Sequence, residues 1–143
     1  MKKIYSKSEP DKLILSLMRY DDISEYRTDI CPNEERLQIS GRKLKKGLKV
    51  KAHKHISIEN VIRLTTKTDI TQEAWVVFEG CIKGTFYDLD DSVLYETKIG
   101  KGDVIVLFRG GHSLEVLDED TIFYEFKTGP YNGTKSDKED INE

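Results

Sequence analysis

Three histidines are the side chains best suited to chemistry in this sequence, and they are the only histidines it contains. His53 and His55 are separated by one residue, and His112 follows the pair Gly110-Gly111. Residues two apart in an extended strand point to the same face, so two imidazoles can converge on one ion. Imidazole nitrogen with a carboxylate oxygen suits zinc, iron, nickel, manganese or copper better than calcium. The histidines therefore predict a site for a divalent transition metal.

Glu73 is the carboxylate that we expect to complete this site. It opens an apolar run from 73 to 78, in which Glu73, Trp75 and Val77 would share one face of a strand. The run from Gly47 presents a difficulty, because strict alternation places Lys49 and Lys51 on the same face as the histidine pair. A buried metal site requires either that the strand leaves the sheet there or that a β-bulge resets its phase.

Composition restricts the class of protein. A chain of 143 residues is long enough for one domain with a core, and its net charge of −3 argues against a nucleic-acid-binding protein. No apolar stretch approaches the roughly 18 residues of a membrane helix, and the first residues lack the apolar core of a signal peptide. Cys31 and Cys81 are isolated, which predicts neither a zinc knuckle nor a disulfide framework. We expect a cytoplasmic protein.

The hydrophobic pattern consists of short extended runs separated by turn residues, which predicts an all-β fold. We expect a single domain over 1–131, with N-terminal strands and a loop in 1–46 and a core barrel in 47–127. The polar residues 132–143 predict a flexible tail or one that packs on a partner. Nine or ten strands with short links are typical of a double-sheet jelly roll. The run 88–92 reads as a hairpin loop, and its aspartates lack the glycine and glutamate spacing of a calcium-binding loop.

Two motifs in the sequence resemble those of the cupin superfamily. Gly47, then His53-Lys54-His55, and later Glu73 and Gly80 resemble the first motif; Gly102 and Phe108-Arg109-Gly110-Gly111-His112 resemble the second. The chain also resembles small single-domain cupins found among surface-polysaccharide biosynthesis proteins. The first motif departs from the usual pattern, since Glu59 stands at the ordinary offset from the histidines. We favour Glu73, because a strand and a closing glycine follow it, and this choice implies a lengthened hairpin between His55 and Glu73.

The resemblance implies a double-stranded β-helix (a jelly-roll barrel) with a metal near its centre, held by His53, His55, Glu73 and His112. Two classes of function follow. The first is an enzyme for a small polar substrate such as a carbohydrate or sugar nucleotide, either an isomerase or epimerase with Lewis-acid chemistry or an iron-dependent dioxygenase. The second is a non-catalytic cupin that binds a metal or small ligand and supports a partner enzyme. An open pocket would favour the enzyme.

Further residues are candidates for roles at such a site. Guanidinium groups bind phosphate or carboxylate, and phenols transfer protons. The candidates are Arg63 and Arg109 for substrate binding, and Tyr87, Tyr124 and Tyr131 for catalysis. The resemblance also implies a homodimer, in which the segment 4–20 is the part most suited to add a strand to a neighbour.

Overall fold

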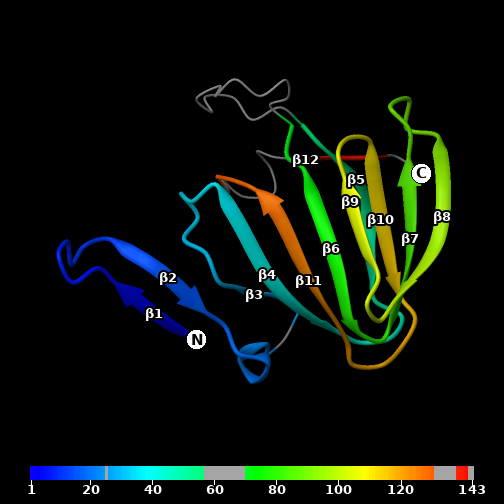
Figure 1. Cartoon of the computed structure of the whole chain (residues 1–143). Coiled ribbons are helices and arrows are strands. Elements are labelled where there is room, and N and C mark those ends of the chain that lie inside the picture. The colour runs from blue at the N-terminus through cyan, green and yellow to red at the C-terminus, as the bar shows by residue number, and fades with distance from the viewer. Residues whose placement is uncertain (25, 57–69, 131–137, 142–143) are drawn as a thin grey trace.

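The computed structural model describes residues 1–24, 26–56, 70–130 and 138–141 (Figure 1). Nearly all of the regular secondary structure in these residues is β-strand. One 3-10 turn, η1 (Tyr20–Asp22), precedes the main sheets. The strands are β1 (Lys2–Tyr5), β2 (Leu13–Leu17), β3 (Thr28–Asp29), β4 (Leu37–Leu44), β5 (Lys49–His55), β6 (Glu73–Glu79), β7 (Cys81–Tyr87), β8 (Val93–Gly100), β9 (Val104–Leu107), β10 (Gly111–Val116), β11 (Thr121–Thr128) and β12 (Lys138–Asp140). The predicted all-β class is confirmed.

Two five-stranded sheets form the body of the protein. Their strand orders are β12-β5-β10-β7-β8 and β3-β4-β11-β6-β9, so strands that are distant in sequence become neighbours. The pairs are antiparallel, and the inner faces of the two sheets share one apolar core. This arrangement is the jelly roll that the sequence predicts.

The apolar core fills one end of the barrel. Side chains from both sheets are no more than 2% exposed there: Leu44, Val77, Ile82, Val116 and Phe123. At the other end of the same strands the inward-facing residues are polar, as the burial of Glu73, His112 and Lys127 shows. The packed end therefore fixes the strands, and their opposite ends hold charged and titratable groups in place.

A β-bulge in β5 brings the histidine pair to the inner face. His112 of β10 pairs with His53, whereas Leu114 pairs with Val50, so β5 has one more residue than its partner over this stretch. Val50 packs against the core, and Ala52 packs on the outer side of the sheet with Tyr87. The bulge separates the exposed lysines from the buried histidines and removes the difficulty that simple alternation presents.

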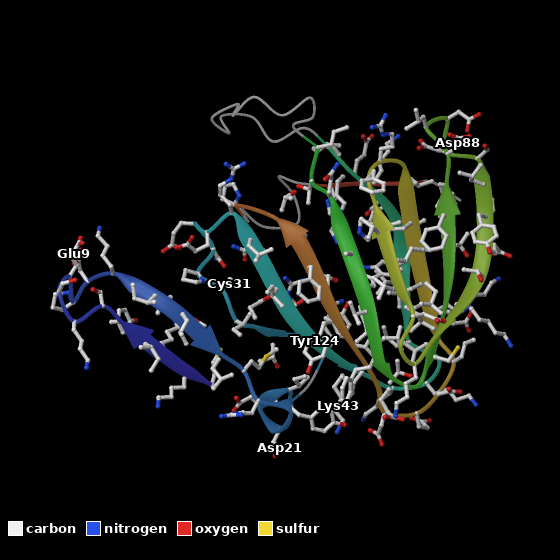
Figure 2. The ribbon with its side chains drawn as sticks, viewed as in Figure 1. Glu9, Asp21, Cys31, Lys43, Asp88 and Tyr124 are labelled. Carbon is white, nitrogen blue, oxygen red and sulfur yellow. The ribbon has the colours of Figure 1, made fainter. Side chains whose placement is uncertain are left out.

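The N-terminal strands β1 and β2 form a hairpin that projects from the barrel. Among the described strands they pair only with each other, and Figure 2 places Glu9 in their connecting turn, on the opposite side of the molecule from Asp88. The hairpin carries exposed apolar side chains, including Ile14 at 63% and Leu15 at 49%. The segment in which we expected an additional strand therefore does contain extended structure with an apolar surface.

The tail that the sequence predicts to be flexible contains a strand. β12 pairs antiparallel with β5 through Lys138 opposite His55, and Ile141 is 7% exposed because it packs against Ala52 and Tyr87. The polar composition of the tail does not indicate this pairing, because the pairing depends on the free edge of β5 in the folded sheet. The expected extended run 61–66 and most of the lengthened hairpin lie outside the described residues.

Cys31 and Cys81 are free, half-buried thiols. Within the described residues, no helix has the length and apolar character needed to cross a membrane.

Candidate metal centre

The three histidines meet at the polar end of the barrel. His53 and His55 come from β5 and His112 from β10, and each offers a ring nitrogen within 4.8 Å of those of the other two. The rings of His53 and His112 lie closest, with centroids 4.3 Å apart. Two adjacent strands thus bring together residues that are more than fifty positions apart in the sequence.

The backbone of the bulge orients His53. Its Nδ1 lies 2.8 Å from the carbonyl oxygen of Lys51. Because a carbonyl oxygen only accepts hydrogen bonds, Nδ1 carries the proton, and Nε2 of the neutral ring keeps its lone pair. This is the arrangement in which a histidine binds a metal through one nitrogen while the other is held in place.

Glu73, at the start of β6, lies beside the histidines on the facing sheet. Its Oε2 accepts a hydrogen bond from His55 Nε2 at 3.0 Å, and its Oε1 lies 3.9 Å from His112 Nε2. The indole nitrogen of Trp75 also donates to Oε1. The predicted strand face of Glu73, Trp75 and Val77 is confirmed, since each is at most 5% exposed. The carboxylate is therefore held against two of the three imidazoles.

Burial sets the protonation of this cluster. Burial lowers the pKa of His112 to about 3, although the charge of Glu73 acts in the opposite direction. Burial also lowers the pKa of His53. For Glu73, burial favours a higher pKa, but the hydrogen bond from His55 and the charges of His112 and His55 outweigh it and lower the pKa overall. At neutral pH the imidazoles of His53 and His112 are therefore neutral beside an ionised Glu73.

These groups fit a divalent transition metal. Neutral imidazole and carboxylate are the protonation states that coordinate metals. Ligand atoms that share an ion at about 2.1 Å lie about 3 to 4 Å apart, and the three imidazole nitrogens already lie within 4.8 Å of one another. The donor set is typical of zinc, iron, nickel or manganese rather than calcium.

A cavity of about 160 Å³ lies next to the cluster. Its walls include the three histidines with Glu73, Trp75 and Leu114. The described residues of the other, charged wall are Tyr26, Arg27, Arg42, Glu125 and Lys127, and Lys138 of β12 lies beside His55. A volume below the roughly 300 Å³ of a typical ligand pocket admits only a small molecule or one end of a larger one. The site is nevertheless open to a ligand on one side, unlike a closed structural metal site.

The other predicted site residues lie elsewhere. Tyr87 is on the outer side of β7, where its hydroxyl lies 3.4 Å from Ser113 Oγ. Tyr124 packs against Phe78 on the outer side of β11, with ring centroids 6.2 Å apart. Arg109 is exposed in the turn between β9 and β10. None of these three lines the cavity. Arg63, Tyr131 and the alternative ligand Glu59 lie outside the described residues.

Sequence reasoning missed the charged wall of the cavity. Arg42 and Lys127 are 5% and 7% exposed, and both face inward from β4 and β11. Charged residues in a strand are ordinarily assigned to the solvent side, and the cations from Arg42 to Lys54 give the impression of a solvated strand and turn. The alternation of Phe123, Glu125 and Lys127 was the available signal, because Phe123 belongs to the core and the other two share its face.

The fold is shared with proteins of known structure. Neither a protein-family model nor a curated protein matches the sequence. CapF from Staphylococcus aureus, a capsular polysaccharide assembling protein, matches with a TM-score of 0.65 and 19% identity, over 96% of this chain and 37% of that one. Oxalate decarboxylase from Bacillus subtilis matches with a TM-score of 0.55 and 18% identity, over 75% and 24% of the two chains. KdgF from Halomonas sp. matches with a TM-score of 0.52 and 14% identity, over 71% and 76%.

These are cupin-fold proteins, and the chain has the cupin fold, as its two sequence motifs predict. It spans well under half of the CapF and oxalate decarboxylase chains that it matches. The Bacillus subtilis decarboxylase contains Mn(II) centres. The fold and the histidine cluster together define a cupin-fold barrel that carries a candidate metal centre.

Proposed function

We propose that this protein is a metal-dependent isomerase or epimerase of a small carbohydrate or sugar nucleotide. The observation that carries the proposal is the convergence of His53, His55, His112 and Glu73 at the end of a polar cavity. In this proposal the four side chains hold zinc, iron, nickel or manganese. A bound divalent ion supplies Lewis-acid polarisation of a carbonyl or hydroxyl oxygen.

The cavity wall offers groups that hold or move a proton. Burial and the charge of Glu73 raise the pKa of Glu125, while Arg42 and Arg27 act in the opposite direction. A raised pKa brings a carboxyl closer to the range in which it can exchange a proton. Tyr26 contributes the phenol among the described lining residues. Trp75 and Leu114 exclude water from one side of the cavity, which strengthens the electrostatic interactions inside it.

Similarity of fold to a capsular polysaccharide assembling protein supports a role in polysaccharide biosynthesis. The cavity of about 160 Å³ supports a sugar as the part of the substrate that enters, with any nucleotide remaining outside. A cytoplasmic location remains a prediction from the sequence, as does the iron-dependent dioxygenase.

Isomerase or epimerase activity is tested by proton exchange at carbon. The metal-loaded protein is incubated in deuterium oxide with keto-hexoses, free and nucleotide-linked, and deuterium next to the carbonyl is followed by NMR. We expect exchange with at least one sugar, and a loss of about 100-fold or more after chelation, since polarisation by a metal contributes several kcal/mol.

Full exchange after removal of the metal would reject the metal-dependent mechanism. Absence of exchange across the set, in protein that retains a stoichiometric metal and binds a sugar, would instead support the non-catalytic cupin that assists a partner enzyme.

We also propose that the protein forms a homodimer through the outer face of the sheet that contains β6, β9 and β11. This outer apolar face consists of Phe78, Val104, Val106 and Phe108, each at least 46% exposed, with half-buried Tyr124 and Phe126. Strand pairing places Ala74 between Val106 and Phe126, so the apolar residues form a continuous row across the three strands. Exposed apolar patches of this kind typically mark interfaces between proteins. A second copy of the chain would bring two apolar surfaces to such an interface, this outer apolar face and the β1–β2 hairpin.

Light scattering after size exclusion tests the dimer. Wild-type protein is expected to have the mass of two chains, and Val106→Lys that of one, because a charge at a buried interface lacks a partner. Val93→Lys is the matched control, since Val93 is 60% exposed on β8 of the other sheet. A monomeric wild type, or a dimer disrupted by Val93→Lys alone, would contradict the proposed interface.

A further inference from the structure

The wall of the cavity opposite the histidines is charged, and it is held by strand register. Antiparallel pairing places Lys127 between Gln38 and Glu73, and Glu125 between Ser40 and Trp75. Arg42 lies two residues from Ser40 on the same inward face of β4 and is 5% exposed. Buried charges are costly unless they are paired or bind a ligand. The burial of Arg42, Glu125 and Lys127 therefore requires that each is paired with an opposite charge or binds a ligand.

Pairing within the wall accounts for part of the charge. Glu125 accepts a hydrogen bond from Arg27 Nη1 at 2.9 Å through one oxygen, and its other oxygen lies 3.3 Å from Arg42 Nη1. Arg27 is also paired with Asp29, which lies outside the cavity. The lining residues include four cations, Arg27, Arg42, Lys127 and Lys138, and two carboxylates, Glu73 and Glu125. Among the described lining residues together with Asp29, the cationic side chains outnumber the carboxylates by one, and a divalent ion would add two more positive charges.

Arg42 is the residue of this wall whose side chain is best suited to bind a ligand. Its Nε is buried and has no hydrogen-bond partner among the described residues. Its guanidinium carbon lies 4.7 Å from the ring centroid of Tyr26 and 5.9 Å from that of Phe123. These rings and Glu125 fix the plane of the guanidinium, so its donors point in set directions. An oxygen anion is the group that satisfies such a donor and offsets the excess charge.

We propose that Arg42 binds a carboxylate or phosphate group of the substrate, at the side of the cavity that faces the histidine cluster. The inference rests on the proposed function only in that the ligand is taken to be a sugar. It adds that the sugar is anionic, with its charged group on Arg42 and the remainder directed toward His53, His55 and His112. Glu125 and Tyr26 act as positioning residues for Arg42.

Three sugars that differ in one substituent test this subsite: glucuronate, glucose 6-phosphate and glucose. Titration calorimetry measures their binding to the zinc-loaded full chain, without any requirement for turnover. We expect at least one of the two anions to bind about 10-fold or more tightly than glucose, because a charge-assisted hydrogen bond contributes about 1.5 to 3 kcal/mol. The better of the two anions identifies whether the group is a carboxylate or a phosphate.

Arg42→Gln is expected to remove this preference, by about 10-fold or more, while glucose affinity and zinc stoichiometry stay within about twofold. Lys43→Gln is the matched control, since Lys43 is adjacent on β4 and 42% exposed on its side chain. Arg42→Lys keeps a charge beside Glu125 and is expected to recover only part of the preference. In wild-type protein, the NMR signal of the Arg42 Nε proton should shift on titration with the preferred anion, a result that does not depend on a folded variant.

Equal affinity for the three sugars, no binding of either anion, or an unchanged preference in Arg42→Gln would each overturn the assignment. These outcomes are independent of the exchange assay. Preference for an anion without deuterium exchange would support the Arg42 subsite and reject the isomerase. Deuterium exchange without preference for an anion would support the isomerase and reject the subsite.

Discussion

His53→Ala and His112→Ala are each expected to abolish stoichiometric binding of a divalent transition metal while the chain remains folded. Both imidazoles are nearly buried, at 6% and 3% exposed, and both belong to the cluster of three. Loss of a residue that merely orients a ligand costs 10- to 100-fold in affinity, so loss of a ligand should cost at least about 100-fold. Elemental analysis after dialysis, with circular dichroism to verify the fold, measures both effects.

Two controls accompany these variants. Ser113→Ala changes the neighbour of His112 on the opposite side of β10 and should leave the metal content intact. Glu59→Ala should do so as well, if Glu73 is the carboxylate ligand. Full metal retention in both histidine variants would reject the ligand assignment, and loss of metal in Glu59→Ala would transfer the carboxylate role to Glu59.

Metal-free protein is expected to lose stability as the pH falls below about 6.5. Burial lowers the pKa of His112 to about 3 in the folded chain, against about 6.5 for an ordinary histidine. Between these two values the unfolded chain binds a proton that the folded chain does not, so the free energy of unfolding decreases with falling pH and is fully retained above about 6.5. For His112 alone the loss at pH 5 is about 2 kcal/mol. The lowered pKa of His53 acts in the same direction.

Thermal unfolding of chelator-treated protein at about pH 7.5, 6 and 5 measures this dependence. His112→Gln has no titrating group at this position and should show a flatter profile than wild type. A wild-type protein that is equally stable at pH 7.5 and pH 5, or a variant with an unchanged profile, would show that His112 is not held neutral by burial.

The sequence was sufficient to predict the fold and the meeting of the metal-binding candidates. His53 and His55 are the only closely spaced histidines, and the apolar run after Glu73 identifies a strand that faces the core. Both features are local, so they can be recognised without knowledge of which strands are neighbours. The need for a bulge could also be stated in advance, because lysines alternate in phase with the histidine pair.

Hydrophobicity alone does not predict the charged wall, because β11 reverses the usual relation between polarity and burial. Its apolar residues Ile122, Tyr124 and Phe126 alternate with Phe123, Glu125 and Lys127, and the second set lies inside the barrel. A prediction from hydrophobicity alone assigns the first set to the core. It therefore places Tyr124 near the site and Glu125 in solvent, the opposite of what the structure shows. A polar cavity inside and an apolar face outside produce this reversal, and both are properties of the assembled sheets.

The bulge in β5 also limits what alanine scanning can reveal. The acceptor that orients His53 is a main-chain carbonyl, and replacing the Lys51 side chain leaves that oxygen in place. A scan of side chains would therefore record position 51 as neutral, although its peptide group determines which nitrogen of His53 is presented. Replacing that peptide bond by an ester, which weakens the carbonyl as an acceptor, would expose a dependence that conventional mutagenesis overlooks.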